Sequence, residues 1–142
     1  MESGAIDLKA LRELVPFAAE LGIELLEARP ELVRARLEWT HERTTTADVM
    51  HGGVIMSLAD TCGGIAAFLN LPEGAQGTAT IESKTNFLRA VRGGSITAIT
   101  RPLHKGRTLI VLETEVARDD GKLAAKVTQT QIYHYRGAAG EG

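Results

Sequence analysis

The chain has 142 residues, a formal net charge of −2 and one cysteine, Cys62. This length suits one domain with an ordinary hydrophobic core. The charge argues against nucleic acid as a partner, because no global basic field draws phosphates in, and one cysteine forms no intramolecular disulfide. The charged start MESGAIDLKALREL is unlike a secretory signal, and no apolar run approaches the ~20 residues of a membrane span. We therefore expect a cytoplasmic protein without a membrane partner.

The chain begins with a predicted helical segment, residues 1–20. Within it, residues 7–20 carry apolar side chains at helical spacing. Asp7 is a plausible N-cap, and Pro16 should kink or divide the helix. A single domain is expected to follow over residues 21–136, and the glycine-rich end, 137–142, is expected to be a disordered tail.

Two strands should come next. The segment GIELLEAR leads to a turn at Arg29-Pro30-Glu31, and ELVRARLEW follows it. In that second segment Val33, Ala35 and Leu37 alternate with charged residues. Alternation of this kind is typical of a half-buried strand, so the pair predicts a hairpin.

A long apolar run, GGVIMSLADTCGGIAAFLN, then predicts a helix over about 53–69. Beyond it, four alternating runs end at glycine-containing turn signals, which favours hairpins. We therefore predict a four-stranded antiparallel meander from about residue 76 to 136. The expected fold class is α+β, a curled antiparallel sheet of about six strands wrapped around one central apolar helix.

Asp60 is the only charged residue in that apolar helix. A helical wheel separates it from the bulky face and places it on a stripe of small residues. The bulky face comprises Val54, Leu58, Cys62, Ile65 and Leu69, and the small stripe comprises Gly53, Ser57, Gly64 and Ala67. Asp60 is either a solvated polar position or a functional carboxylate. The stripe leads back to Gly52 and Gly53 at the helix start, where free N–H groups can stabilise an oxyanion.

The stretch HGGVIMSLAD, followed by strands containing NFLRAV, resembles the hotdog-fold acyl-CoA thioesterases of the PaaI-like, phenylacetate-pathway group. The resemblance covers roughly residues 20–136. It implies that the Gly52 N–H polarises the thioester carbonyl and that Asp60 acts as a general base on water or as a nucleophile. It also implies that these two residues come from opposite subunits of a dimer, and that His51 holds the loop or the substrate.

The chain departs from this family at two positions before the histidine. The family usually has Asn or Gln where this chain has Thr45, and Gly where it has Asp48. Thr45 can still form hydrogen bonds, but it offers no amide. Some members also place a Ser or Thr in the strand after the helix, for which Thr78 and Thr80 are the nearest candidates.

The resemblance implies acyl-CoA as the substrate, with coenzyme A part of the substrate and no separate cofactor or metal. Gly53 would border the substrate, and basic residues near turns would meet its phosphates; these are Arg89, Lys105 and Arg107. Self-association as a homodimer, or as a homotetramer, is expected. Two alternatives stay open: a hotdog dehydratase or hydratase acting on an acyl thioester, and a non-catalytic acyl-CoA-binding protein.

Overall fold

The computed structural model describes residues 5–137. Apart from Gly137, the tail expected at 137–142 lies outside the described residues. Two short helices open the fold, α1 (Leu8–Glu13) and α2 (Pro16–Leu21). Asp7 caps α1 by accepting a hydrogen bond from the Ala10 N–H at 3.1 Å. Pro16 is the first residue of α2, a position where its missing N–H costs nothing. The predicted cap and the predicted division of the helix are both confirmed.

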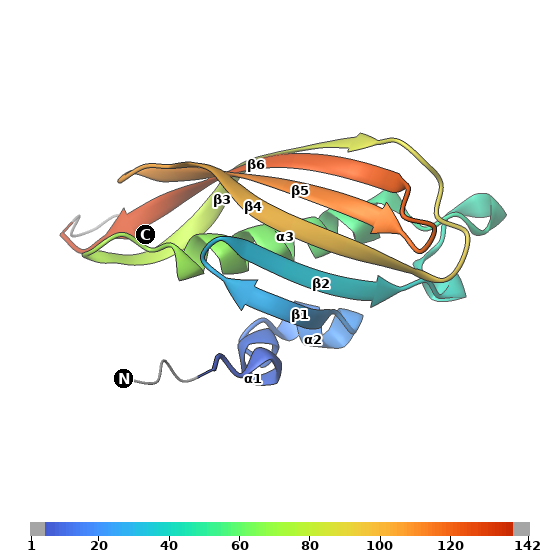
Figure 1. Ribbon diagram of the computed structural model, residues 1–142, viewed down its shortest axis with the longest axis horizontal. Coiled ribbons are helices and arrows are strands. Elements are labelled where there is room, and N and C mark those ends of the chain that lie inside the picture. The colour runs from blue at the N-terminus through green and yellow to red at the C-terminus, as the bar shows by residue number, and fades with distance from the viewer. Residues whose placement is uncertain (1–4, 138–142) are drawn as a thin grey trace.

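Six strands form one antiparallel sheet that curls around the long helix α3 (Gly52–Leu69). Figure 1 shows α3 in the hollow of the sheet, with α1 and α2 beside β1. The strands are β1 (Glu24–Arg29), β2 (Leu32–Glu38), β3 (Ala75–Phe87), β4 (Ser95–Lys105), β5 (Leu109–Arg118) and β6 (Leu123–Tyr135). The predicted α+β class and the curled sheet around a central helix are confirmed.

The strand order is β1-β2-β4-β5-β6-β3, so the predicted four-stranded meander is wrong. Of the four strands predicted to form the meander, β4, β5 and β6 are joined as consecutive hairpins. β3 lies at the far edge beside β6, and β4 pairs instead with β2. The Gly93-Gly94 signal therefore belongs to a crossover. Such a signal shows that the chain turns but not which strand pairs next.

The core is aliphatic and forms between α3 and the concave face of the sheet. On β2, Val33, Ala35 and Leu37 are buried, as their alternation predicts. On α3, the buried side chains include Leu58, Cys62 and Ile65 of the predicted bulky face, whereas Val54 and Leu69 are only half-buried. Ala67, predicted on the small stripe, is also buried, so the buried face of α3 is wider than the predicted bulky face.

By length and composition alone, α3 is long and apolar enough to cross a membrane. The expectation that the sequence contains no apolar run of that length was therefore wrong. Half of this helix is buried inside the protein, and it contacts all six strands. A core helix needs apolar residues on most of its surface for the same reason as a membrane helix. The hydropathy of α3 is therefore explained by its place in the core.

The loop before α3 contains two 3₁₀ turns, His41–Arg43 and Thr46–Asp48. Ala47 and Asp48 have φ angles of 63° and 58°. This left-handed region favours glycine and tolerates aspartate better than alanine. The aspartate at position 48 therefore meets the same backbone requirement as the glycine that the resembled family carries there.

Replacing Ala47 by glycine should stabilise the protein by about 0.5 kcal/mol. The left-handed conformation costs an L-residue about 1–2 kcal/mol, and the added chain entropy of glycine offsets about half of that relief. Urea denaturation measures the difference. In Ala19→Gly, within α2, the same chemical change should cost about 1 kcal/mol instead. A loss of stability in Ala47→Gly would contradict the strain argument.

Candidate active site

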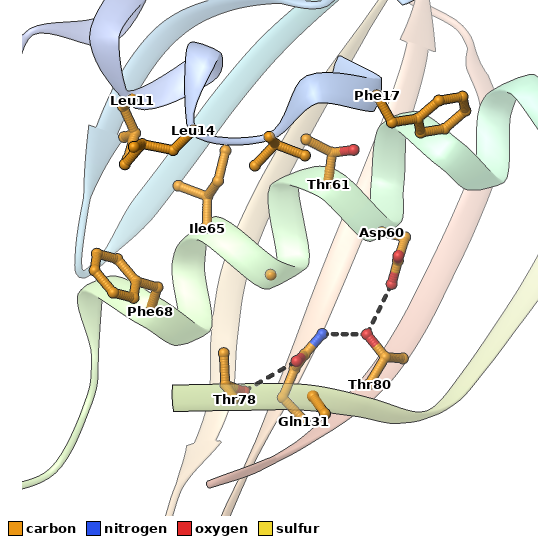
Figure 2. A pocket seen from close by; sticks show the side chains of 13 residues that line it. Leu11, Leu14, Phe17, Asp60, Thr61, Ile65, Phe68, Thr78, Thr80 and Gln131 are labelled. Carbon is orange, nitrogen blue, oxygen red and sulfur yellow. Dashed lines mark hydrogen bonds between the residues drawn. The ribbon is translucent and has the colours of Figure 1, made fainter. Parts of the chain in front are cut away.

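The first part of the site is a pocket of about 420 Å³ between the N-terminal helices, α3 and the start of β3, here called the Asp60 pocket. Figure 2 shows Leu11, Leu14 and Phe17 on one side of it and Asp60, Thr78 and Thr80 on the other. Most of its walls are apolar, and its polar groups gather near Asp60. The lining residues are Leu11, Leu14, Val15, Phe17, Asp60, Thr61, Gly64, Ile65, Phe68, Thr78, Ala79, Thr80 and Gln131.

Asp60 is held by two donors on the same oxygen. Its Oδ1 accepts a hydrogen bond of 2.8 Å from the Thr80 hydroxyl and one of 2.7 Å from Gln129 Nε2. Thr80 Oγ1 in turn accepts from Gln129 Nε2 at 3.2 Å and from Gln131 Nε2. Among residues 5–137, no partner reaches Oδ2 of Asp60, so one carboxylate oxygen remains available for chemistry.

The directions of these hydrogen bonds follow from the carboxylate. An ionised carboxylate only accepts, so both groups that contact Oδ1 must donate to it. Thr80 has one hydroxyl proton, which is used toward Asp60 and leaves Thr80 Oγ1 to accept from the two glutamines. Gln131 Oε1 accepts from Thr78 Oγ1 at 3.0 Å (Figure 2). The two threonines predicted near the site are thus joined to Asp60 through one network.

Gln129 and Gln131 were missed by the sequence reasoning. Both are buried, with 1% and 2% of their surface exposed. They lie on the inward face of β6, in alternation with outward-facing residues. A usable signal was present, because a glutamine at an inward strand position must find polar partners.

The second part of the site lies at the start of α3. A pocket of about 420 Å³, here called the Gly52 pocket, has Gly52, Thr45 and Arg89 among its lining residues. Within residues 5–137 the Gly52 N–H has no hydrogen-bond partner. His51 caps the helix, because its Nδ1 accepts from the Gly53 N–H at 2.8 Å. His51 therefore caps the start of α3, and its role in holding the loop or the substrate stays a prediction.

Gly52 lies under the ring of Phe87. A Cβ atom placed on Gly52 would come within 2.9 Å of Phe87 Cζ. Thr45, at the position where the family has an amide, directs its hydroxyl to the carbonyl of Thr46 at 3.0 Å. Thr45 therefore makes a local turn contact and presents no amide to the Gly52 pocket.

The two parts of the site are separated within one chain. Asp60 follows Gly52 by eight residues of helix, which at the usual rise is roughly 12 Å. The structure joins Asp60 with Thr78 and Thr80, and it joins Gly52 with Thr45 and Arg89. It does not bring the two groups together in one chain. No reacting carbonyl can contact both Asp60 and Gly52 of the same chain.

The predicted phosphate-binding residues also separate. Arg89 lies at the Gly52 end, where its Nη1 donates to the Leu123 carbonyl at 2.9 Å. Lys105 and Arg107 flank the β4–β5 turn, and Tyr135 at the end of β6 donates to the Arg107 carbonyl. That turn lies beside the start of β3, because Ala75 pairs with Tyr135. One chain therefore does not gather all three cations around one ligand.

Cys62 is not a nucleophile in this fold. It is fully buried on α3, and burial raises the pKa of its thiol to about 12, although a hydrogen bond with Thr100 acts in the opposite direction. A thiol in this state is protonated and inaccessible at neutral pH. The remaining candidate for activating water in the Asp60 pocket is the carboxylate.

Fold and site together define a thioesterase of the hotdog class, and comparison with known proteins identifies the family. The model of the thioesterase superfamily matches residues 47–125. A candidate esterase of Saccharolobus solfataricus is 34% identical over 123 residues, which span 84% of this chain and 86% of that protein. The chain therefore belongs to the thioesterase superfamily, and it is a thioester hydrolase.

Solved structures agree with this assignment. A thioesterase of Haemophilus influenzae superposes with a TM-score of 0.87 at 27% identity, covering 96% of each chain. The Escherichia coli PaaI protein of the phenylacetic acid degradation operon has a TM-score of 0.79 at 23% identity, covering 89% of each chain. A Streptococcus pneumoniae protein described as a hypothetical thioesterase with coenzyme A has a TM-score of 0.72 at 22% identity, covering 80% of this chain and 86% of that one. The predicted PaaI-like hotdog fold is confirmed.

Proposed function

We propose that the protein hydrolyses acyl-CoA thioesters, with Asp60 of one subunit and the Gly52 N–H of another acting on the same carbonyl. The observation that carries this proposal is the Asp60 carboxylate, held through Oδ1 at the polar end of an otherwise apolar pocket. As a general base, Oδ2 removes a proton from water as the hydroxide adds to the carbonyl carbon; the C–S bond then breaks, and the proton passes from Asp60 to the leaving thiolate of coenzyme A. As a nucleophile, Oδ2 attacks that carbon itself, the C–S bond breaks and an anhydride forms between Asp60 and the acyl group; water then hydrolyses the anhydride, which releases the free acid, restores the carboxylate and supplies the proton that the thiolate takes up.

The Gly52 N–H would stabilise the negative charge that develops on the thioester oxygen. Backbone N–H groups at a helix start are fixed in place and benefit from the positive end of the helix dipole. They therefore need no reorganisation as the charge forms. Thioester hydrolysis needs a group that activates water or attacks the carbonyl, and a donor for the oxyanion. In this proposal Asp60, near the middle of α3, supplies the first, and the Gly52 N–H, at the start of α3, supplies the second.

A dimer would bring these two groups together. Among residues 5–137, β3 pairs only with β6, so its other edge has no strand beside it there, and Ile81 on this strand is 58% exposed. A long exposed edge strand with an apolar residue is unfavourable in a lone subunit. We propose that a twofold axis at this edge pairs two copies and places Gly52 of one beside Asp60 of the other.

The acyl group would occupy the apolar part of the Asp60 pocket. Leu14, Phe17 and Phe68 remain 74%, 56% and 49% exposed, so an apolar ligand between them would cover surface now in contact with water. The coenzyme A part would lie toward the Gly52 end, where Arg89 offers a cation. The coenzyme A named with the structurally similar Streptococcus protein supports this choice of thiol.

Truncating Phe17 should weaken the binding of large apolar acyl groups. In Phe17→Ala we expect KM for octanoyl-CoA and phenylacetyl-CoA to rise about tenfold, because the lost contact area is apolar. KM for acetyl-CoA should stay unchanged. Steady-state kinetics measure all three, with Ile6→Ala as a matched control, since Ile6 is an exposed apolar residue of the same segment outside the pocket. An equal effect on acetyl-CoA would argue against this pocket as the acyl site.

The proposal is tested by release of free coenzyme A from a panel of aromatic and aliphatic acyl-CoAs. We expect turnover, with apolar acyl groups larger than acetyl preferred. Release from no member of the panel would reject the acyl-CoA substrate. Turnover by a strictly monomeric form of the protein would reject the shared site.

A further inference from the structure

Gln129 on β6 makes contacts that packing alone does not require. It is one of the largest fully buried side chains, with 1% of its surface exposed. Its Nε2 donates to Asp60 Oδ1 at 2.7 Å and to Thr80 Oγ1 at 3.2 Å. Its Oε1 is buried and has no hydrogen-bond partner among the described residues. Burial of an unpartnered amide oxygen is costly, so Gln129 needs an explanation beyond stability.

The carboxylate of Asp60 explains the orientation of the amide. Rotating the amide by half a turn would bring Oε1 against Oδ1, two acceptors facing each other. Because Asp60 only accepts, Nε2 must face it, and Oε1 is left facing α3. Among residues 5–137, Oε1 is left without a hydrogen-bond partner because Nε2 of the same amide must donate to Asp60.

Gly63 makes room for this arrangement. A Cβ atom placed on Gly63 would lie 1.9 Å from Gln129 Oε1 and 2.5 Å from its Cδ. No other residue type therefore fits beside the amide without displacing it. Gly63 lies one helical turn after Asp60, and an ordinary helix would prefer alanine there.

We propose that Gln129 is a positioning residue for the hydrolysis, and that Gly63 is the residue that admits it. The inference rests on the proposed function of Asp60. Thr80 lies on the edge strand and is exposed, whereas Gln129 comes from the interior of the sheet. Gln129 thus fixes the carboxylate to the rigid core and holds Oδ1, which leaves Oδ2 to react. It touches no substrate, because it is buried behind Asp60 and does not line the pocket.

Steady-state kinetics of Gln129→Met test this role. Methionine has a similar volume and keeps the site filled, but it donates no hydrogen bond. We expect kcat to fall about 30-fold, since a misplaced reacting group costs up to about 100-fold, with KM changed by less than about threefold. Thr114→Val is the matched control. It removes a buried hydrogen bond, the 2.6 Å contact with Thr100, away from the Asp60 pocket, and should change stability while leaving kcat at the wild-type value.

Gly63→Ala and the double variant Gly63→Ala/Gln129→Ser separate positioning from folding. Gly63→Ala should lower both the denaturation midpoint and kcat, because the new methyl group displaces the amide. Shortening residue 129 in the double variant should restore the midpoint, while kcat stays at the level of Gln129→Met. Recovery of kcat together with stability would overturn the positioning role, as would wild-type kcat in Gln129→Met. If the wild type itself released no coenzyme A from any acyl-CoA, the proposed function and this inference would both fall.

Discussion

Asp60→Asn should lower kcat for acyl-CoA hydrolysis by about 10³-fold, within the range of about 10²–10⁴ that a general base contributes. Asparagine has the same shape as aspartate, and its oxygen can still accept from Thr80 and Gln129, as Oδ1 does now. Its amide nitrogen replaces Oδ2, and this nitrogen can neither take a proton from water nor attack a thioester. KM should change little, because the apolar walls of the pocket remain.

The measurement is release of free coenzyme A by wild type and variant at matched concentrations, with far-UV circular dichroism to show that both are folded. Asp120→Asn provides the matched control, since this exposed carboxylate pairs with Arg118 outside the Asp60 pocket. It should retain wild-type kcat. If Asp60→Asn kept full turnover, Asp60 would have no role in the mechanism. It would then be a solvated polar residue on the helix, the other interpretation of a lone aspartate.

Sequence periodicity predicted the elements of this fold better than their pairing. Asp7 and Pro16 act on residues within one or two turns, so their effects can be derived from local rules. The place of β3 at the outer edge depends on which strand completes the curl around α3, and no local signal encodes that choice. Once β3 is at the edge, Thr80 faces Asp60 across the gap between sheet and helix, which neither residue reveals alone.

The candidate site shows the same difference between features with a local sequence signal and contacts between distant residues. HGG followed by Asp60 is a local signal, and it pointed to both of the groups that the proposed mechanism uses. The supports of Asp60 come from β3 and β6, where Thr80 and Gln129 are 20 and 69 residues away in the chain. The helices that wall the pocket were predicted as helices, yet nothing in the sequence showed that Leu14 and Phe17 face Asp60. Contacts over such separations follow from the completed sheet, so they could be found only in the structure.

Gly52→Pro should lower kcat by about 10²–10³-fold, the usual cost of losing one oxyanion donor. Gly52 is the first residue of α3, where proline fits the helix and removes only an N–H that is unpaired in any case. His51 has φ −61° and ψ 133°, the extended conformation that a residue before proline prefers. The substitution therefore deletes the proposed oxyanion donor while leaving the helix intact.

Gly52→Ala is the control for this variant, because it adds a Cβ and keeps the N–H. The added carbon must displace the ring of Phe87, which is 52% exposed and free to move. We expect kcat for Gly52→Ala within about threefold of wild type, far above that of Gly52→Pro. Equal losses in the two variants would mean that the space under Phe87 matters and the N–H does not.

The two inactive variants together test the shared site. In a dimer of Gly52→Pro and Asp60→Asn chains, one site combines both defects and the other has both groups intact. Random exchange of equal amounts makes half of the dimers mixed, so the mixture should recover about one quarter of wild-type activity. Each variant alone should stay inactive after the same treatment. Native mass spectrometry shows whether the chains have exchanged. If the mixture stays inactive after exchange, Gly52 and Asp60 of different subunits do not act on the same carbonyl. Because they are roughly 12 Å apart in one chain, only one of them would then be catalytic.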